Sequence, residues 1–392
     1  MNNYAFLLLF VVFGLSCQKQ ITNSFTLKSE RERFYAEKNL FVDSVFQFLP
    51  HTTNEIKYQS AFWASELMLR KSALDSANLI FACENFTDFS KNFKRSVLQH
   101  IYTLYPHGFK LQLDSLIRFE TDAKRFAIMA NYLIRLDSTY RELTLVLKQK
   151  KFNNWHENPI LRAMYESFSD SKPLSETQIA ELIAFRSKSN QASFFVFVSK
   201  NRDLPGYLLI QNKQGEILKH QGTVLKFKLL ARSITNMPEY ITNGNTPQGV
   251  YSIQGIGSSD NVFIGKTPTV ISVLPFETSL SRFSFGKLNG GWTLAQYNRF
   301  FPVSWSNYLP KNRAYYAGQA GRTEIILHGT TINPEYYKQQ IYYPFTPSLG
   351  CLCLLERWDS KHGLLIESDQ LRLIKTLKHH NIKNAFMYVI EI

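Results

Sequence analysis

Two short stretches of the sequence carry residues that can do covalent chemistry. One is the pair His328-Gly329, and the other is Ser-Leu-Gly-Cys at residues 348–351. A thiol attacks carbonyl groups as the thiolate, so a catalytic cysteine needs a proton acceptor or a positive charge nearby to lower its ordinary pKa of about 8.5. His328 can accept that proton. The sequence therefore predicts a nucleophile, Cys351, with His328 as its base.

The glycine before the cysteine adds a second part of such a site. Gly350 lets the backbone turn sharply, so we expect the N–H groups of Gly350 and Cys351 to face a substrate carbonyl. Two such donors begin an oxyanion hole. Ser348 is expected to hydrogen-bond the backbone near the nucleophile.

A third feature, Thr-Pro-Gln-Gly-Val-Tyr at residues 246–251, precedes both stretches, and its proline and glycine suit a turn that enters a strand. With these three features in this order, the chain resembles the YkuD-type L,D-transpeptidase catalytic domain over roughly residues 193–392. That family has a Thr-Pro-x-Gly-x-Tyr turn, a His-Gly at a strand end and a Ser/Thr-His-Gly-Cys motif. The resemblance implies a β-rich α+β catalytic domain.

The same resemblance implies an acyl-transfer enzyme that needs no metal and no cofactor. Cys351 would be the nucleophile and His328 the base, supported by Gly350, Ser348 and Gly329. The implied substrates are peptidoglycan stem peptides. The thiol would attack the bond between the third residue and a terminal D-Ala, and an amine of a second stem would resolve the acyl-thioester.

Several positions depart from the family's pattern. Leu349 stands where the family has His, and Cys353 stands where it has an Arg that holds substrate or shapes the pocket. Arg357 and Lys361 are the candidates to replace that arginine. The interval from the histidine to the cysteine is also longer than in the family, and we expect its residues 341–345 in the substrate wall.

Three other functions fit these residues. Water as the acceptor would make the protein an L,D-carboxypeptidase or endopeptidase that acts on stem peptides. The departures at Leu349 and Cys353 alternatively indicate a degenerate, non-catalytic scaffold that binds the cell wall. A redox or metal site of Cys351, Cys353 and His328 is the weakest alternative, because these residues supply three ligands and the sequence shows no fourth.

The first residues predict export. Residues 1–17 fit a signal peptide, because the apolar run 4–15 is too short to span a bilayer. Its end, Gly-Leu-Ser-Cys at 14–17, resembles a bacterial lipobox, although no Lys or Arg precedes the apolar run. We therefore expect the protein in the cell envelope, on the periplasmic side, anchored to a membrane by a lipid on Cys17.

Length and charge limit the partners. The chain has 392 residues, enough for two separate cores. It carries 45 Lys and Arg against 31 Asp and Glu, a net charge of +14 that favours an anionic envelope or membrane surface. The basic residues are scattered rather than clustered with aromatics, so nucleic acid is not an expected partner.

Periodicity divides the chain near residue 190, which predicts a multidomain protein. From about 29 to 187, apolar residues recur at helical spacing, so we expect an all-α helical domain over residues 18–190. Its last helix opens with a capping-box spacing at Ser175 and Gln178. This domain would position the enzyme or dock a protein partner.

Beyond it, alternating and continuous apolar runs predict a catalytic domain over residues 191–392. Strands are expected at 194–198, 207–210, 225–229, 250–253, 269–273, 324–327 and 386–392, and a helix at 370–379. The segment 255–322 lacks a stable period and is expected to hold strands broken by a lid-like loop over the site. Its Tyr308, Tyr315 and Tyr316 are the candidates for a tyrosine in the pocket.

Overall fold

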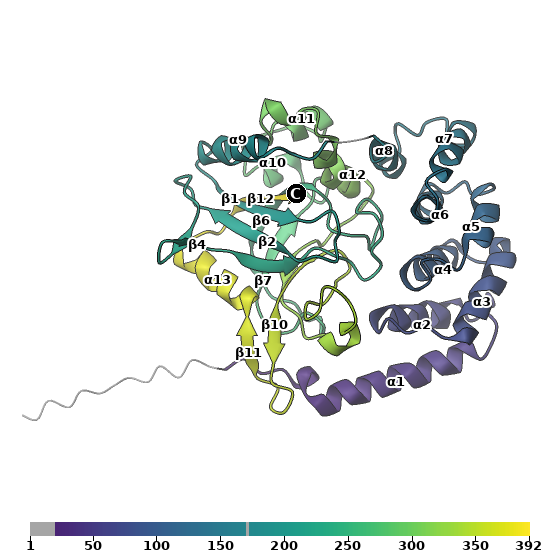
Figure 1. Cartoon of the computed structure of the whole chain (residues 1–392). Coiled ribbons are helices and arrows are strands. Elements are labelled where there is room, and N and C mark those ends of the chain that lie inside the picture. The colour runs from purple at the N-terminus through teal and green to yellow at the C-terminus, as the bar shows by residue number, and fades with distance from the viewer. Residues whose placement is uncertain (1–19, 170–171) are drawn as a thin grey trace, which may run out of the picture.

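The computed structural model describes residues 20–169 and 172–392 (Figure 1). The predicted signal peptide and the lipidation of Cys17 fall outside the described residues. Within the described ranges, thirteen α-helices and a closed eight-stranded barrel make this a mixed α+β protein. The α+β class is thereby confirmed, whereas the division into domains at residue 190 stays a prediction.

The first half of the described chain is helical, as the apolar periodicity predicts. Its helices are α1 (Lys28–Phe46), α2 (Glu55–Leu67), α3 (Ala73–Glu84), α4 (Lys91–Leu104), α5 (Lys110–Ile117), α6 (Ala123–Leu136), α7 (Tyr140–Lys151), α8 (Pro159–Glu166) and α9 (Glu176–Ser187). Side-chain caps fix where two of them begin: the Asp122 carboxylate accepts the Arg125 N–H, and Ser175 with Gln178 forms the expected capping box.

The second half forms the barrel. Its strands are β1 (Ala192–Val198), β2 (Gly206–Gln211), β5 (Phe227–Leu230), β6 (Gly249–Gly257), β7 (Thr269–Val273), β8 (Leu327–His328), β9 (Leu352–Leu354) and β12 (Ala385–Glu391). They close in the order β1-β12-β6-β7-β8-β9-β5-β2. Two hairpins project from it, β3 (Lys219–His220) with β4 (Thr223–Val224) and β10 (Glu356–Trp358) with β11 (Leu365–Ser368).

The continuous apolar run of β1 has a physical explanation in the packing. Successive side chains of a strand point to opposite faces. Phe194 and Val196 join a buried cluster that includes Leu373 of α13 (Asp369–His379), whereas Phe195 joins a second cluster shared with the helices. Both faces of β1 are therefore covered, and no position along it has to be polar.

Helices α2, α4, α6 and α8 form a row of neighbours, and α8 also contacts α12 (Arg313–Gln319). Figure 1 shows this row on the side of the helical arc that faces the barrel. Two of its helices bind the long loop between β5 and β6. Asn243 donates to Gln99 Oε1 of α4 over 3.1 Å, and Lys124 Nζ of α6 donates to Thr242 Oγ1 over 3.0 Å. The helices thus hold a loop of the barrel in place.

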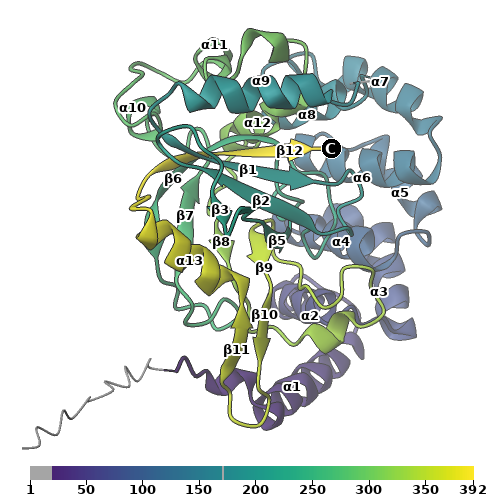
Figure 2. The same cartoon turned by 60° about the vertical axis from the view of Figure 1, so that its left-hand side comes forward.

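The end of the helical arc at α1 is also tied to the barrel half. Figure 2 shows the β10–β11 hairpin beside α1. At that contact the N–H of Lys28 donates to the Ser360 carbonyl over 2.8 Å, and the N–H of Asn23 donates to the Gly363 carbonyl over 2.8 Å.

The segment 255–322 differs from the expectation. Only β7 and the end of β6 lie in it as strands, and the rest includes three short helices, α10 (Leu280–Phe283), α11 (Leu294–Asn298) and α12. The stretch with these helices packs by its aromatic rings on the outer face of the barrel: the rings of Phe300 and Phe386 are 5.2 Å apart. The predicted strand 324–327 is also wrong in extent, because Glu324 has a left-handed φ of 59° and β8 begins at Leu327.

One buried cluster continues from the helices to the outer face of the barrel, and it includes Phe126 of α6 and Tyr388 of β12. We therefore expect Phe126→Ala to lower the free energy of unfolding by about 3–5 kcal/mol, and helices and barrel to unfold at one urea midpoint. Circular dichroism in the far and near ultraviolet measures both. The matched control is Phe119→Ala, whose ring is 82% exposed, with a change below about 0.5 kcal/mol. Two separate midpoints would contradict the shared core.

Candidate active site

The turn that carries Cys351 lies directly before β9 and is fixed by bonds to the loop between β5 and β6. The N–H of Ile234 donates to the Ser348 carbonyl over 2.8 Å. Thr246 Oγ1 donates to the Gly350 carbonyl over 2.8 Å. The Thr-Pro-x-Gly-x-Tyr turn therefore supports the cysteine turn through its first residue, 104 positions away along the chain.

A buried guanidinium lies under this turn. Arg322 is 3% exposed, and it donates to the backbone carbonyls of Glu239, Asn245 and Gly244, the last two over 2.9 and 3.0 Å. Burial lowers the pKa of Arg322 to about 10. The residue remains charged at neutral pH, and its charge lowers the pKa of the Cys351 thiol.

Gly350 is required where it stands for two reasons. Its φ is +117°, a conformation that L side chains rarely adopt, and a Cβ there would collide with the Arg322 guanidinium and lie 2.7 Å from the Gly244 carbonyl oxygen. The turn and the guanidinium can therefore pack together only without a side chain at this position.

The expectation of a free Gly350 N–H is wrong. That N–H donates to Ser348 Oγ over 3.0 Å, and the same hydroxyl donates to the Cys351 carbonyl over 2.9 Å. Ser348 thus bonds the backbone around the nucleophile, as expected. Within the described chain, the N–H groups of Leu349 and Cys351 make no hydrogen bond, so these two are the donors that the turn can offer to an oxyanion.

His328 ends β8, and its ring is held in one tautomer. Nδ1 donates to the carbonyl of Gly329, which leaves Nε2 as the acceptor nitrogen. Burial lowers the pKa of His328 below its ordinary value of 6.5, so the imidazole is neutral at pH 7. A neutral imidazole with a free acceptor nitrogen is the form that a general base needs.

Gly329 makes room for a buried carboxylate. A Cβ at Gly329 would collide with the carboxylate of Glu356, which accepts the Thr330 N–H over 2.9 Å and the Ser368 hydroxyl over 2.7 Å. Burial raises the pKa of Glu356 to about 7. Glu356 therefore fixes the backbone that follows His328, a role that the sequence alone left open.

Strand pairing brings the histidine and the cysteine to the same place. β8 and β9 are parallel neighbours, with His328 opposite Cys353, so Cys351 lies two residues before the partner of His328. Strand spacing puts the Cα atoms of His328 and Cys351 roughly 8 Å apart. Both residues line one cavity of about 750 Å³.

The thiol does not bond the imidazole in this structure. Cys351 Sγ donates to the carbonyl of Glu324 over 3.2 Å, and the N–H of Ile326 faces the sulfur and lowers the pKa of the thiol. Burial outweighs this N–H and Arg322, and raises the pKa of Cys351 to about 11. The resting site therefore combines a protonated thiol with a neutral imidazole.

Several residues that the sequence suggested for the cavity are not among its lining residues. Arg357 bonds Glu367 on the exposed β10–β11 hairpin. In residues 341–345, Tyr342 and Phe345 pack into a small separate core. Lys361, Tyr308, Tyr315 and Tyr316 also do not line the cavity. The same holds for Cys353, which is buried and contacts Thr346 Oγ1 instead.

Other residues of the cavity carry no signal in the sequence. Arg322 is one, and the aromatic residues that line the cavity are Trp63 of α2 and Phe263. A lone arginine or tryptophan carries no local signal for such a position, because its partners lie up to 200 residues away along the chain. Of the predicted lid, residues 258–264 do border the cavity.

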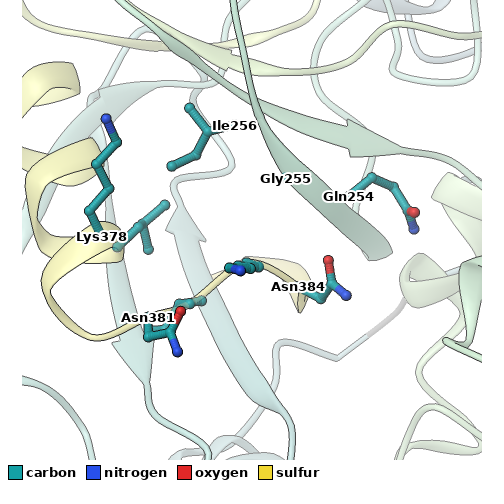
Figure 3. A pocket seen from close by; sticks show the side chains of 9 residues that line it. Gln254, Gly255, Ile256, Lys378, Asn381 and Asn384 are labelled. Carbon is teal, nitrogen blue, oxygen red and sulfur yellow. The ribbon is translucent and has the colours of Figure 1, made fainter.

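A second hollow, of about 570 Å³, is lined by the end of β6 and by residues 377–378 and 381–384 (Figure 3). Its lining side chains include Lys378, Asn381 and Asn384 and hold no cysteine, histidine or carboxylate. The hollow therefore lacks the thiol and the imidazole that the predicted chemistry requires.

The described residues form no group of three or more His, Cys, Asp or Glu side chains that could hold a metal ion. Among the described helices, none combines the length and the apolar character needed to cross a bilayer. Comparison of the chain with protein-family models, with curated proteins and with solved structures gives no match. The resemblance to the YkuD-type family therefore depends on the sequence motifs alone.

The packing of Gly350 on Arg322 predicts a specific cost. Gly350→Ala is expected to lower the free energy of unfolding by about 2–4 kcal/mol, because it adds overpacking to backbone strain. The matched control is Gly222→Ala, since Gly222 also has a positive φ of +81° but open space around a Cβ. It should cost about 1 kcal/mol. Equal losses in urea titrations of the two variants would contradict the contact with Arg322.

Proposed function

We propose that this protein is a cysteine-dependent L,D-transpeptidase that acts on peptidoglycan stem peptides in the cell envelope. One observation carries the proposal. Cys351 and His328, the two residues of the motifs that can do the chemistry, line the same cavity although 23 positions separate them. The neutral imidazole and the cation under the cysteine turn are the further support.

In the proposed first step, His328 Nε2 takes the thiol proton as Cys351 Sγ attacks the carbonyl carbon of the stem's third residue. The bond to D-Ala breaks, the imidazolium gives its proton to the leaving amine, and an acyl-thioester remains. In the second step, the amine of another stem attacks the thioester. Its proton passes through His328 to the departing sulfur, which restores the thiol.

The backbone supplies the charge stabilisation in both steps. The oxyanion would accept from the N–H groups of Leu349 and Cys351, which have no partner within the described chain. Gly350 does not take part through its N–H, since Ser348 Oγ occupies that donor. The role of Ser348 is to hold the turn in shape.

A second candidate function is a non-catalytic scaffold that binds the cell wall. The resting thiol favours it: burial raises the pKa of Cys351 to about 11, and Sγ bonds a backbone carbonyl rather than the imidazole. This candidate predicts that Cys351 never forms an acyl-enzyme, so the next experiment separates the two functions.

Cys351→Ala is expected to abolish the covalent adduct that the protein forms with a carbapenem or with a stem tetrapeptide ending in D-Ala. Intact-mass measurement detects the adduct. The matched control is Cys353→Ala, because Cys353 is a buried thiol on β9, two residues after Cys351, and its Sγ lies 3.6 Å from Thr346 Oγ1. The control should still form adduct. No adduct in the unaltered protein would favour the scaffold.

The pH dependence of acylation tests the base. His328 must be neutral to accept the proton, and burial lowers its pKa, so the rate should fall only below about pH 6.5 and stay level above it. His328→Asn removes the base. Its residual rate should be lower, lack the level region above about pH 6.5, and instead rise continuously with pH toward the Cys351 pKa of about 11. A level region above about pH 6.5 that persists in His328→Asn would exclude His328 as the base.

A further inference from the structure

The cavity that holds Cys351 and His328 has a wall from outside the barrel. Trp63 and Leu67, both on α2, line it together with Phe263 of the loop after β6. The family resemblance covers only residues from about 193, so it says nothing of this wall. The helical half of the chain therefore shares the cavity with the two residues of the proposed chemistry.

The wall is connected to the histidine segment by short contacts. The rings of Trp63 and Phe263 are 5.6 Å apart, and the Phe263 carbonyl accepts the Thr331 N–H over 2.9 Å. Thr331 lies three residues after His328. The Leu67 carbonyl also accepts from the Tyr337 hydroxyl over 2.8 Å. These bonds fix the wall relative to the base.

A second set of bonds fixes the wall relative to the nucleophile. Glu66, next to Leu67 on α2, accepts from Gln99 Nε2 over 2.8 Å, and Gln99 Oε1 accepts from Asn243 over 3.1 Å. Asn243 belongs to the loop whose carbonyls bind Arg322 under the cysteine turn. The position of α2 is therefore set from both sides of the cavity.

The wall has a defined chemistry. It is apolar, and the ionisable residues among those lining the cavity are Arg322, Glu324, His328 and Cys351. Arg322 already donates to three carbonyls. The Trp63 indole N–H makes no hydrogen bond within the described chain, so this side chain offers a ligand both an apolar ring and a free donor. Such a surface suits an uncharged stretch of peptide, with the N–H available to a peptide carbonyl.

We propose that α2 supplies a substrate subsite, in which Trp63 and Leu67 bind the uncharged peptide backbone of the donor stem on the acyl side of the scissile bond. Trp63 is then a specificity-determining residue, and the helical half belongs to the binding site. This inference rests on the proposed function for its ligand, but its test does not need turnover.

The test measures binding in the full chain with Cys351→Ala, which cannot form an acyl-enzyme. Isothermal titration with a stem tetrapeptide ending in D-Ala gives the Kd. Adding Trp63→Ala should raise the Kd by about tenfold or more, because a buried aromatic contact is lost. Trp63→Phe, which keeps a ring, should recover part of the loss. The matched control is Ile56→Ala on the same helix, 80% exposed and outside the cavity, with a Kd within twofold.

The reactivity of the Cys351 thiol distinguishes a structural effect of Trp63→Ala from loss of the subsite. With Cys351 present, Trp63→Ala should leave the rate of alkylation by iodoacetamide unchanged and should keep the circular-dichroism spectrum of the folded protein. An unchanged Kd, or a Kd that rises only together with a changed alkylation rate, would overturn the inference. Failure of the proposed function has another signature, namely the absence of adduct in the unaltered protein while the tetrapeptide still binds to the α2 wall.

Discussion

The arrangement of the site depends on one buried cation. Arg322 is paired with no carboxylate in the described part of the chain, and burial disfavours its charge. Hydrogen bonds to the carbonyls of Glu239, Gly244 and Asn245 compensate for the cost of burying this charge. The loop between β5 and β6 must therefore place three carbonyl oxygens around the guanidinium. That loop is bonded from the other side by α4 and α6. Helices, loop, guanidinium and cysteine turn thus form one continuous series of contacts that holds Cys351 in place.

The parts of the fold that the sequence predicted correctly are those with local causes. The period of the apolar residues and the capping box at Ser175 locate helices, because both depend on residues close together in the sequence. The strand at 269–273 is also predicted, since its bounds follow from β-branched residues. The strand at 324–327 failed because the left-handed Glu324 ends the extended backbone, and nothing in the residue type reveals that conformation.

The candidate site could be predicted only in part, because several of its contacts join residues that are far apart in the sequence. Motif order identified Cys351 and His328, which the barrel brings to adjacent strands. The sequence could not show that the Ser348 hydroxyl takes the Gly350 N–H, because glycine flexibility allows both a free and a bonded N–H. Arg322 and Trp63 were missed because their partners are remote: Arg322 bonds carbonyls 77 to 83 residues earlier, and the Trp63 ring packs at a tilt against Phe263, 200 residues later.

The electrostatics of the resting site determine how the proposed reaction has to begin. With a Cys351 pKa of about 11, forming the thiolate before attack at pH 7 would require roughly 5 kcal/mol, because each pKa unit corresponds to about 1.4 kcal/mol. A preformed ion pair with His328 is disfavoured further, since burial also opposes the imidazolium. Proton removal is therefore expected during attack, when the substrate oxygen takes the negative charge toward the N–H groups of Leu349 and Cys351. The barrier then depends on how well the substrate is placed, and the α2 wall bears on the rate through that placement.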